Sequence, residues 1–227
     1  MKQDLDSVHD YYCAPRTERE DATVYEIWES GGAFNDSITP STYVPEYRSH
    51  IVLKLLSVTP DDGSVFSIGC GNGFVEADLI AHSRAVRAMD CNDEAVRLTR
   101  TKGVDAFSAD FFELSADDVV GTTTLYADGL LGHLFDTAEH VRPALQKIKS
   151  LALPPGTQLV FSNDSPRDAT AAFAPHERVA NFWFVSRDYL AEELAGAGFD
   201  PVESYYFPYF RPISGMRNRT ICIARVP

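Results

Sequence analysis

Basic side chains are scarce in this 227-residue chain, which has 20 Lys and Arg against 33 Asp and Glu and a formal net charge of −13. A surface of that sign repels phosphate backbones, so we expect neither DNA nor RNA as a partner or substrate. The sequence also lacks long apolar runs, and its first residues are polar. It therefore predicts neither a membrane span nor a secretory leader.

Cysteine is sparse as well. The four cysteines are Cys13, Cys70, Cys91 and Cys222, and no two of them form a Cys-x-x-Cys pair. This spacing predicts neither a disulfide framework nor a zinc site, and no metal is expected. A P-loop and a Gly-x-Ser-x-Gly motif are absent too. Because free thiols fit a reducing compartment, we expect a cytoplasmic protein.

From residue 64 onward, short apolar and β-branched runs alternate with helical segments, which is typical of an α/β fold with a mainly parallel sheet. Strands are expected at 64–68, 85–89, 104–108, 122–127, 158–162, 202–207 and 220–226. Helices are expected at 73–83, 93–102, 142–151 and 187–197. The turn at 212–215 leaves no room for a helix, so the last two strands should form an antiparallel hairpin. The predicted fold is a Rossmann-like, seven-stranded mixed sheet, parallel with one antiparallel edge strand, flanked by helices.

Two segments fall outside this alternation. Residues 1–57 precede it, with helices suggested at about 22–30 and 46–57, and residues 164–185 form a helix-poor insertion. Segments of that length in a compact domain are more often lids or substrate walls than neutral connections. We therefore expect one domain, in which an N-terminal helical cap covers a core of residues 58–227.

A glycine-rich turn follows the first predicted strand. Gly69, Gly71 and Gly73 let the backbone approach a ligand, and the helix that begins there offers free N–H groups. Asp90 stands about twenty residues further on, where a ribose-binding acid belongs. A dinucleotide fingerprint needs another glycine at the position of Phe74. The ring there disfavours a pyrophosphate and favours a smaller nucleoside ligand.

Together with later motifs, this turn resembles the class I S-adenosylmethionine-dependent methyltransferases. Residues 66–73, Phe-Ser-Ile-Gly-Cys-Gly-Asn-Gly, are similar to motif I of that family. Residues 89–92 resemble the family's acidic end of strand two, and residues 108–111 resemble its aspartate and apolar residue after strand three. Residues 126–136 resemble the family's fourth motif, and residues 153–160 resemble its entry into strand five. The resemblance spans about residues 45–227. It implies a stand-alone, small-molecule enzyme of the natural-product type with S-adenosyl-L-methionine as its cofactor.

The same resemblance implies the cofactor contacts. The glycine turn would receive the methionine part, Asp90 the ribose hydroxyls and Asp110 the adenine amino group. Cys91 and Phe111 would lie on either side of the ring. The predicted cofactor-binding residues are Gly69, Cys70, Gly71, Asn72, Gly73, Asp90, Cys91, Asp110, Phe111 and Ala127. Asp90 and Asp110 also suit helix caps or turns, and Cys70 and Cys91 also suit packing.

The reaction centre of an open α/β sheet lies outside the carboxyl ends of its strands. Asp128 and His133 follow the fourth predicted strand and Asp164 follows the fifth, so these three are the candidate catalytic residues. Two carboxylates can orient a cationic amine or guanidine and receive its proton, whereas a histidine better suits a hydroxyl. N-methylation of an amine or guanidine is the leading prediction, and O-methylation with His133 as the base is the alternative. Both acids also suit ordinary turns, and His133 suits a structural role.

Aromatic side chains gather in the two segments outside the alternation. Among them, Tyr25, Phe34, Tyr43 and Trp183 are predicted to contact a small-molecule acceptor, although packing of the cap on the core explains each equally well. A nicotinamide-dependent oxidoreductase and a non-catalytic nucleoside-binding module stay open as alternatives. The sequence defines neither the acceptor, nor the number of methyl groups added, nor the oligomeric state.

Overall fold

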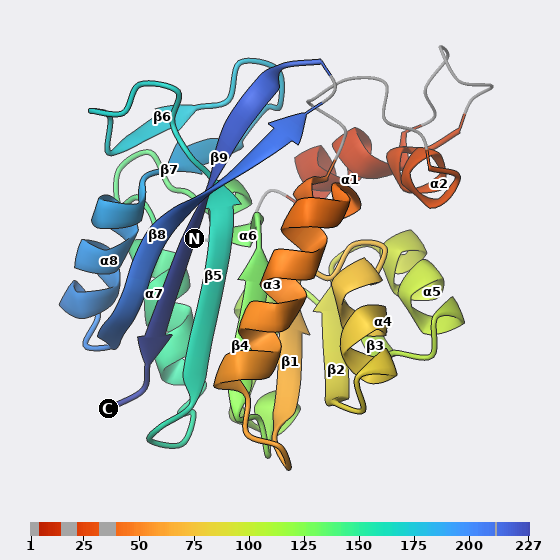
Figure 1. The fold of residues 1–227 in the computed structure, drawn as a ribbon, viewed down its shortest axis with the longest axis vertical. Coiled ribbons are helices and arrows are strands. Elements are labelled where there is room, and N and C mark those ends of the chain that lie inside the picture. Colours follow the sequence, from red (N-terminus) through yellow and green to blue (C-terminus); the bar gives the residue numbers. More distant parts are fainter. Residues whose placement is uncertain (1–4, 15–21, 32–39, 212) are drawn as a thin grey trace.

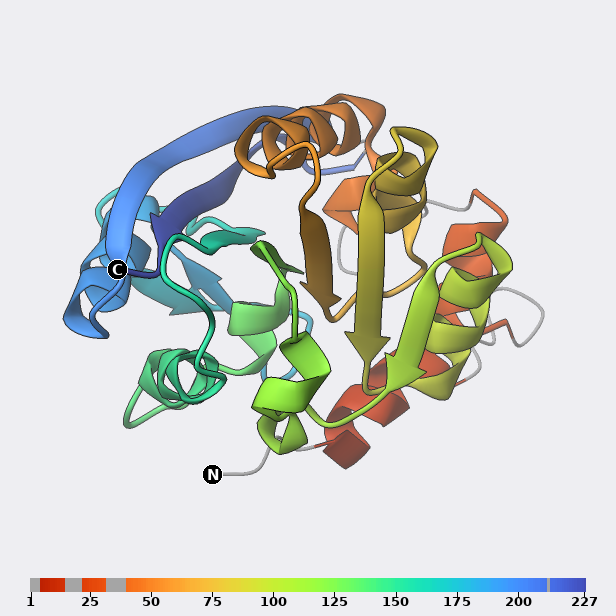
Figure 2. The same cartoon turned by 90° about the horizontal axis from the view of Figure 1, so that it is seen from below.

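The structure, a computed structural model, describes residues 5–14, 22–31, 40–211 and 213–227. Its main feature is a seven-stranded sheet with helices on both faces (Figures 1 and 2). The strands are β1 (Ser64–Ile68), β2 (Ala85–Asp90), β3 (Asp105–Ser108), β4 (Thr124–Asp128), β5 (Gln158–Asp164), β8 (Asp200–Arg211) and β9 (Gly215–Arg225). Their order across the sheet is β3-β2-β1-β4-β5-β9-β8.

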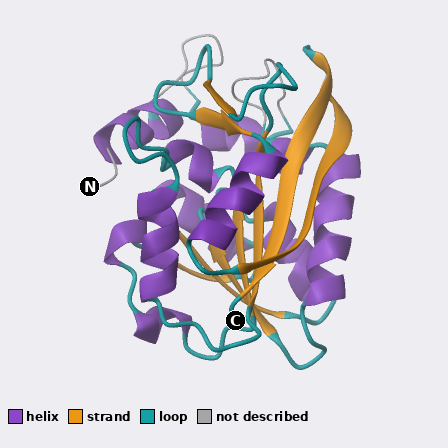
Figure 3. Ribbon diagram, turned by 90° about the vertical axis from the view of Figure 1, so that its left-hand side faces the viewer, coloured by secondary structure: helices purple, strands orange, loops and turns teal. Residues whose placement is uncertain are grey.

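The pairing confirms the predicted mixed sheet. The first five strands pair in parallel, and β9 pairs antiparallel with both β5 and β8. The reversed strand β9 therefore lies one position inside the edge strand β8. The hairpin that these two strands form is confirmed, but its arms are longer than expected and rise above the rest of the sheet (Figure 3).

Helices cover the two sheet faces in two groups. The α-helices are α1 (Leu5–Cys13), α2 (Val24–Glu29), α3 (Pro45–Val58), α4 (Phe74–Ala81), α5 (Asp93–Thr101), α6 (Leu130–His133), α7 (Arg142–Ser150) and α8 (Arg187–Gly196). The 3-10 turns are η2 (Ser41–Tyr43), η3 (Phe111–Glu113) and η4 (Ala116–Val119). Helices α3, α4 and α5 pack on one face, and α6, α7 and α8 pack on the other. No helix among the described residues is long and apolar enough to cross a membrane.

Strand alternation divides the core between these two layers. In β1, Phe66 and Ile68 face the α7 side, while Val65 faces the α3 side. Helix α3 is itself part of the core, because Ile51 and Leu55 are fully buried against the sheet. The predicted cap of residues 1–57 therefore ends in a core helix, and among its described residues α1, α2 and η2 remain as elements that cover the site.

Several local features refine the predicted elements. The Ser186 hydroxyl caps α8 by accepting a bond from the Tyr189 N–H. Asn92 stands at the start of α5, but its side chain makes no capping bond there. The insertion at 164–185 contains a two-stranded antiparallel pair, β6 (Phe173–Pro175) and β7 (Trp183–Val185). Helices α1 and α6 were not predicted.

Candidate active site

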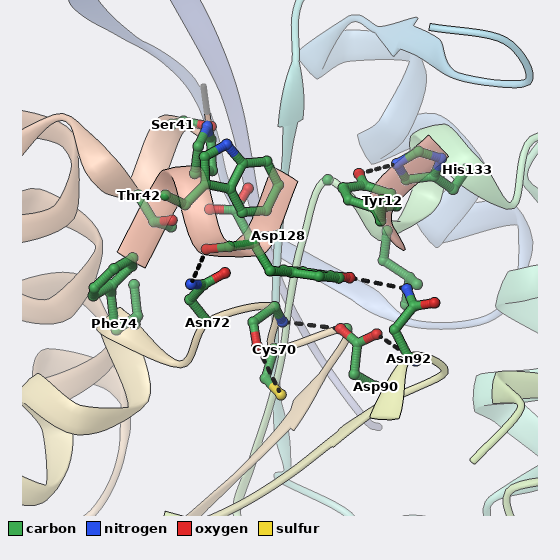
Figure 4. A pocket seen from close by; sticks show the side chains of 18 of the residues that line it. Tyr12, Ser41, Thr42, Cys70, Asn72, Phe74, Asp90, Asn92, Asp128 and His133 are labelled. Atoms are coloured by element: carbon green, nitrogen blue, oxygen red, sulfur yellow. Dashed lines mark hydrogen bonds between the residues drawn. The ribbon is translucent and has the colours of Figure 1, made fainter. Parts of the chain in front are cut away.

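One cavity of about 190 Å³ joins the glycine turn to the carboxyl ends of the central strands, beneath α1 and α2 (Figure 4). The predicted site residues that line it are Gly69, Cys70, Gly71, Asn72, Gly73, Asp90, Cys91, Phe111, Asp128, His133, Asp164 and Tyr25. Those described but absent from its wall are Asp110, Ala127, Tyr43 and Trp183. Phe34 lies outside the described residues.

Glycine is required in the turn for two different reasons. Gly71 has a φ of 53°, and a Cβ built on it would meet no atom within 4 Å, so its backbone is open to a ligand. Gly73 has a φ of 72°, and a Cβ there would lie 2.6 Å from the Thr99 hydroxyl oxygen of α5. The turn is therefore exposed at its second glycine and closely packed at its third.

Asp90 fastens this turn to the end of β2. Its Oδ2 accepts a bond from the Gly71 N–H at 2.9 Å, and its Oδ1 accepts one from the Asn92 N–H at 3.0 Å. The carboxyl is buried, which raises its pKa. The Cys91 backbone N–H and thiol also donate to this carboxyl, and its contact with a ribose stays a prediction.

Two buried acceptors face the cavity beside the turn. Asn72 Oδ1 has no hydrogen-bond partner among the described residues, while its Nδ2 donates to the Tyr25 carbonyl and to Glu29. Glu76, in the first turn of α4, is bonded to the Ser67 hydroxyl, and burial raises its pKa to about 7. An unpartnered carbonyl oxygen and a buried carboxyl fit a cationic donor such as the ammonium group of a bound amino-acid moiety. Sequence reasoning missed Glu76.

The predicted adenine side is only partly assembled. Cys91 and Phe111 line the cavity, but Asp110 caps η3, where its Oδ1 accepts a bond from the Phe112 N–H at 2.8 Å. Its adenine contact stays a prediction. Burial raises the pKa of Cys91 to about 12, so it is a thiol at neutral pH. Ala127 is buried in the sheet.

The two candidate acids meet around an arginine that the sequence analysis did not identify. Asp128 forms an ion pair with Arg219 and accepts bonds from the hydroxyls of Tyr47 and Tyr126. Asp164 Oδ1 lies 2.9 Å from Nη1 of Arg219. The place between the two carboxylates, where an acceptor cation was expected, is thus filled by a guanidinium. Asp164 Oδ2 has no partner among the described residues.

His133 lies on the opposite wall and is joined to the N-terminal segment. Its Nε2 is hydrogen-bonded to the Tyr12 hydroxyl at 2.7 Å, and its ring packs against Phe182. Burial lowers the pKa of His133 to about 4, so the imidazole is neutral at pH 7 and a weak base.

Helices α1 and α2 close the cavity above the glycine turn. The Tyr12 ring stacks on Tyr25, with ring centroids 5.5 Å apart. The Tyr25 hydroxyl accepts a bond from Asn92 Nδ2 at 2.9 Å, and its carbonyl accepts one from Asn72 Nδ2 at 3.1 Å. Side chains from the turn and from the end of β2 therefore hold this covering segment in place.

Tyr43 and Trp183, the other described residues predicted to contact the substrate, lie away from the cavity. The Tyr43 ring packs against Phe74, with centroids 6.3 Å apart. Trp183 stacks on Phe135 with centroids 4.5 Å apart, while its neighbour Phe182 lines the cavity. Because successive side chains point in opposite directions here, Phe182 faces the site and the predicted Trp183 does not.

Solved structures place the fold in a class. The magnesium protoporphyrin IX methyltransferase ChlM from Synechocystis PCC 6803, with bound S-adenosylmethionine, is 18% identical at a TM-score of 0.63 and covers 100% of this chain and 99% of its own. The 1,6-didemethyltoxoflavin-N1-methyltransferase of Burkholderia thailandensis is 24% identical at a TM-score of 0.59 and covers 79% and 76%. The chain has the class I S-adenosylmethionine-dependent methyltransferase fold.

A curated relative is much more similar in sequence. A tabtoxin biosynthesis enzyme of Pseudomonas amygdali pv. tabaci is 62% identical over 226 residues, which are 99% of this chain and 90% of that protein. The chain belongs to the family of that biosynthesis enzyme. No family model matches it.

Proposed function

We propose that the protein transfers a methyl group from S-adenosyl-L-methionine to a small-molecule acceptor in a biosynthetic pathway, within a single domain. The observation that carries the proposal is the cavity itself. It connects the glycine turn and Asp90 with Asp164 and His133. Membership in the family of a biosynthesis enzyme supports the small-molecule acceptor.

The residues at one end of the cavity fit the cofactor. The backbone at Gly71, with Asn72 Oδ1 and Glu76, would hold its amino-acid part, Asp90 its ribose, and Cys91 and Phe111 its base. When bound, S-adenosylmethionine supplies an electrophilic methyl group on a sulfonium. The covering helices exclude water from this end and hold an acceptor near the methyl group, which methyl transfer requires.

At the other end, an amine acceptor needs a free lone pair and therefore has to lose a proton. Asp164 Oδ2 can accept a bond from the amine and receive that proton. The guanidinium of Arg219 beside it disfavours a charged ammonium. His133 Nε2 is already hydrogen-bonded to the Tyr12 hydroxyl, so it is less available than Asp164 Oδ2 to an acceptor. We therefore place N-methylation of an amine first and O-methylation second, and the N1-methyltransferase of the same fold is a precedent for the first.

Turnover of labelled S-adenosylmethionine with a panel of small amines, amino acids and phenols tests the proposal. If an amine is the acceptor, Asp164→Asn should slow transfer by about 100-fold, within the usual range for loss of a proton-accepting group. The variant His133→Ala should slow it by less than about 10-fold. If phenols acquire the labelled methyl group, and His133→Ala slows transfer far more than Asp164→Asn, the result would instead support O-methylation with His133 as the base.

A further inference from the structure

We infer that Glu29, the last residue of α2, is a positioning residue for cofactor selectivity. It orients the Asn72 amide so that the Oδ1 atom is left for the ammonium group of S-adenosylmethionine. The inference rests on the proposed function, since it concerns the amino-acid end of the same cavity. It gives a helix outside the sheet core a part in the choice of cofactor.

Both N–H groups of the Asn72 amide are engaged by α2. The Nδ2 atom donates to Glu29 Oε2 at 2.7 Å and to the Tyr25 carbonyl at 3.1 Å. A primary amide has two N–H groups and one carbonyl oxygen. Helix α2 therefore takes up the whole donor capacity of this side chain and leaves only an acceptor.

The same two contacts fix which way the amide is turned. If the amide were flipped, Asn72 Oδ1 would face a carboxylate and a carbonyl, and no hydrogen would lie between these acceptors. Buried polar groups left unpaired in this way are costly. The carboxylate is the stronger constraint, because a bond to a charged acceptor is roughly twice as strong as a neutral one. Glu29 thus contributes most to the orientation.

The oxygen that this orientation leaves over is buried. Asn72 is 4% exposed, and its Oδ1 has no hydrogen-bond partner among the described residues. Most buried carbonyl oxygens in proteins accept at least one bond, so this one indicates a donor on a ligand. Asn72 and the buried acid Glu76 both line the cavity. A donor that approaches both is best cationic, as an ammonium group is.

Glu29 is held in place by a cation of its own. Its Oε1 accepts a bond from Lys102 Nζ at 2.6 Å, at the end of α5, which leaves Oε2 for Asn72. The Lys102 ammonium in turn lies 4.9 Å from the centroid of the Phe74 ring. Glu29 is not among the described residues that line the cavity. It therefore acts through Asn72.

Helix α2 is also attached at its other end. The Thr23 hydroxyl donates to Glu94 Oε1 at 2.8 Å, and the Tyr25 hydroxyl accepts from Asn92 Nδ2 at 2.9 Å. Both partners lie at the start of α5, so α2 is attached to both ends of that helix. The acceptors of the Asn72 amide are thus in place before a cofactor binds, and such preorganisation favours its binding.

The expected consequence is selectivity for a nucleoside that carries an amino group. An ammonium group supplies the donor that Asn72 Oδ1 lacks, whereas the same nucleoside thioether without it leaves this oxygen unpaired. A site built to hydrogen-bond one group rejects an analogue without that group, because its own polar atom then stays buried and unpaired.

Calorimetric titration with S-adenosylhomocysteine and with deamino-S-adenosylhomocysteine, which lacks only the α-amino group, tests this inference. We expect the native protein to bind the first about 10-fold or more tightly, as a charge-assisted bond implies. Glu29→Met removes the acceptor that orients Asn72, so the preference should fall to about 3-fold or less. Asn72→Leu removes the Oδ1 atom itself and should lower the preference at least as far.

Two variants serve as controls. Glu29→Gln keeps an oxygen that can accept from Asn72 Nδ2, and Lys102→Met removes the ion pair but not that bond, so both should keep the preference. Because the preference compares two ligands in the same variant, a loss of stability affects both titrations alike.

Equal binding of the two ligands by the native protein, or an unchanged preference in Glu29→Met, would overturn the inference. A preference lost as fully in Glu29→Gln as in Glu29→Met would also overturn it, since the charge and not the orientation would then be responsible. If S-adenosylhomocysteine does not bind the native protein at all, the result counts against the proposed function instead.

Discussion

Arg219 of β9 and Asp128 of β4 form a buried ion pair, with side chains 4% and 10% exposed. They come from strands separated by β5, and they meet because the antiparallel direction of β9 brings its first half to the carboxyl edge of the parallel strands. The pair fixes a positive charge between Asp128 and Asp164, where the sequence alone predicted two acids without a cation of the protein.

Removal of one partner should be costly for stability. Arg219→Met leaves Asp128 and Asp164 close together without their cation, so we expect the free energy of unfolding to fall by about 3 kcal/mol, as is typical of broken buried pairs. The double variant Arg219→Met with Asp128→Asn should lose less than the sum of the single losses. Urea unfolding measures both. Exposed Arg225→Met should change stability by less than about 0.5 kcal/mol, and a similarly small effect at Arg219 would contradict the account.

The bond between Tyr12 and His133 should slow release of a bound cofactor product. Tyr12→Phe removes the hydroxyl but keeps the ring that stacks on Tyr25. A lost bond of about 1 kcal/mol corresponds to a dissociation rate of S-adenosylhomocysteine about 5-fold faster. Stopped-flow fluorescence measures this rate. Tyr205→Phe, which removes a similar bond to His50, is the matched control, and equal rates in the two variants would refute the role of the covering segment.

Glu76 should make stability depend on pH. Burial raises its pKa from 4.5 to about 7, so the folded protein binds this proton more tightly than the unfolded chain. The stabilisation is complete below about pH 4.5 and is lost as the pH rises through about 7. Glu76→Gln should therefore match the native protein near pH 5 and exceed it at pH 8, by up to about 3 kcal/mol.

Thermal or urea unfolding across pH 5 to 8 measures this difference between the two proteins. The matched control is Glu192→Gln, which changes an exposed glutamate of α8. Its pH dependence should follow that of the native protein. If Glu76→Gln also followed the native curve, the glutamate would have an ordinary pKa and would not be buried as described.

Much of the fold was predictable because the information is local. The strand before Gly69 and the helix that Ser186 caps follow from apolar periodicity and from capping chemistry. The hairpin length was not predictable, since residues 208–219 lack the apolar pattern of a strand buried on both faces. Arg219 was missed for the same reason. The signal was present in β9, where alternate positions after it are the buried Ile221 and Ile223.

The candidate site was predictable only where motifs define it. Residues of the glycine turn and Asp90 line the cavity because the turn geometry follows from the sequence. The contacts of Trp183 and Asp110 depend on packing between distant segments. Trp183 joined the core while Phe182 faced the site, and Asp110 serves as a cap. No local pattern determines such alternatives.

The central claim is that the turn and Asp90 bind S-adenosylmethionine, and calorimetric titration with S-adenosylmethionine, S-adenosylhomocysteine and NAD tests it most directly. We expect the first two to bind with a Kd on the order of 10 μM, and NAD not to bind. Asp90→Asn should weaken binding by about 30-fold, as loss of charge-assisted bonds predicts, while exposed Asp93→Asn should not. Binding of NAD alone, or an unchanged Kd in Asp90→Asn, would contradict the account.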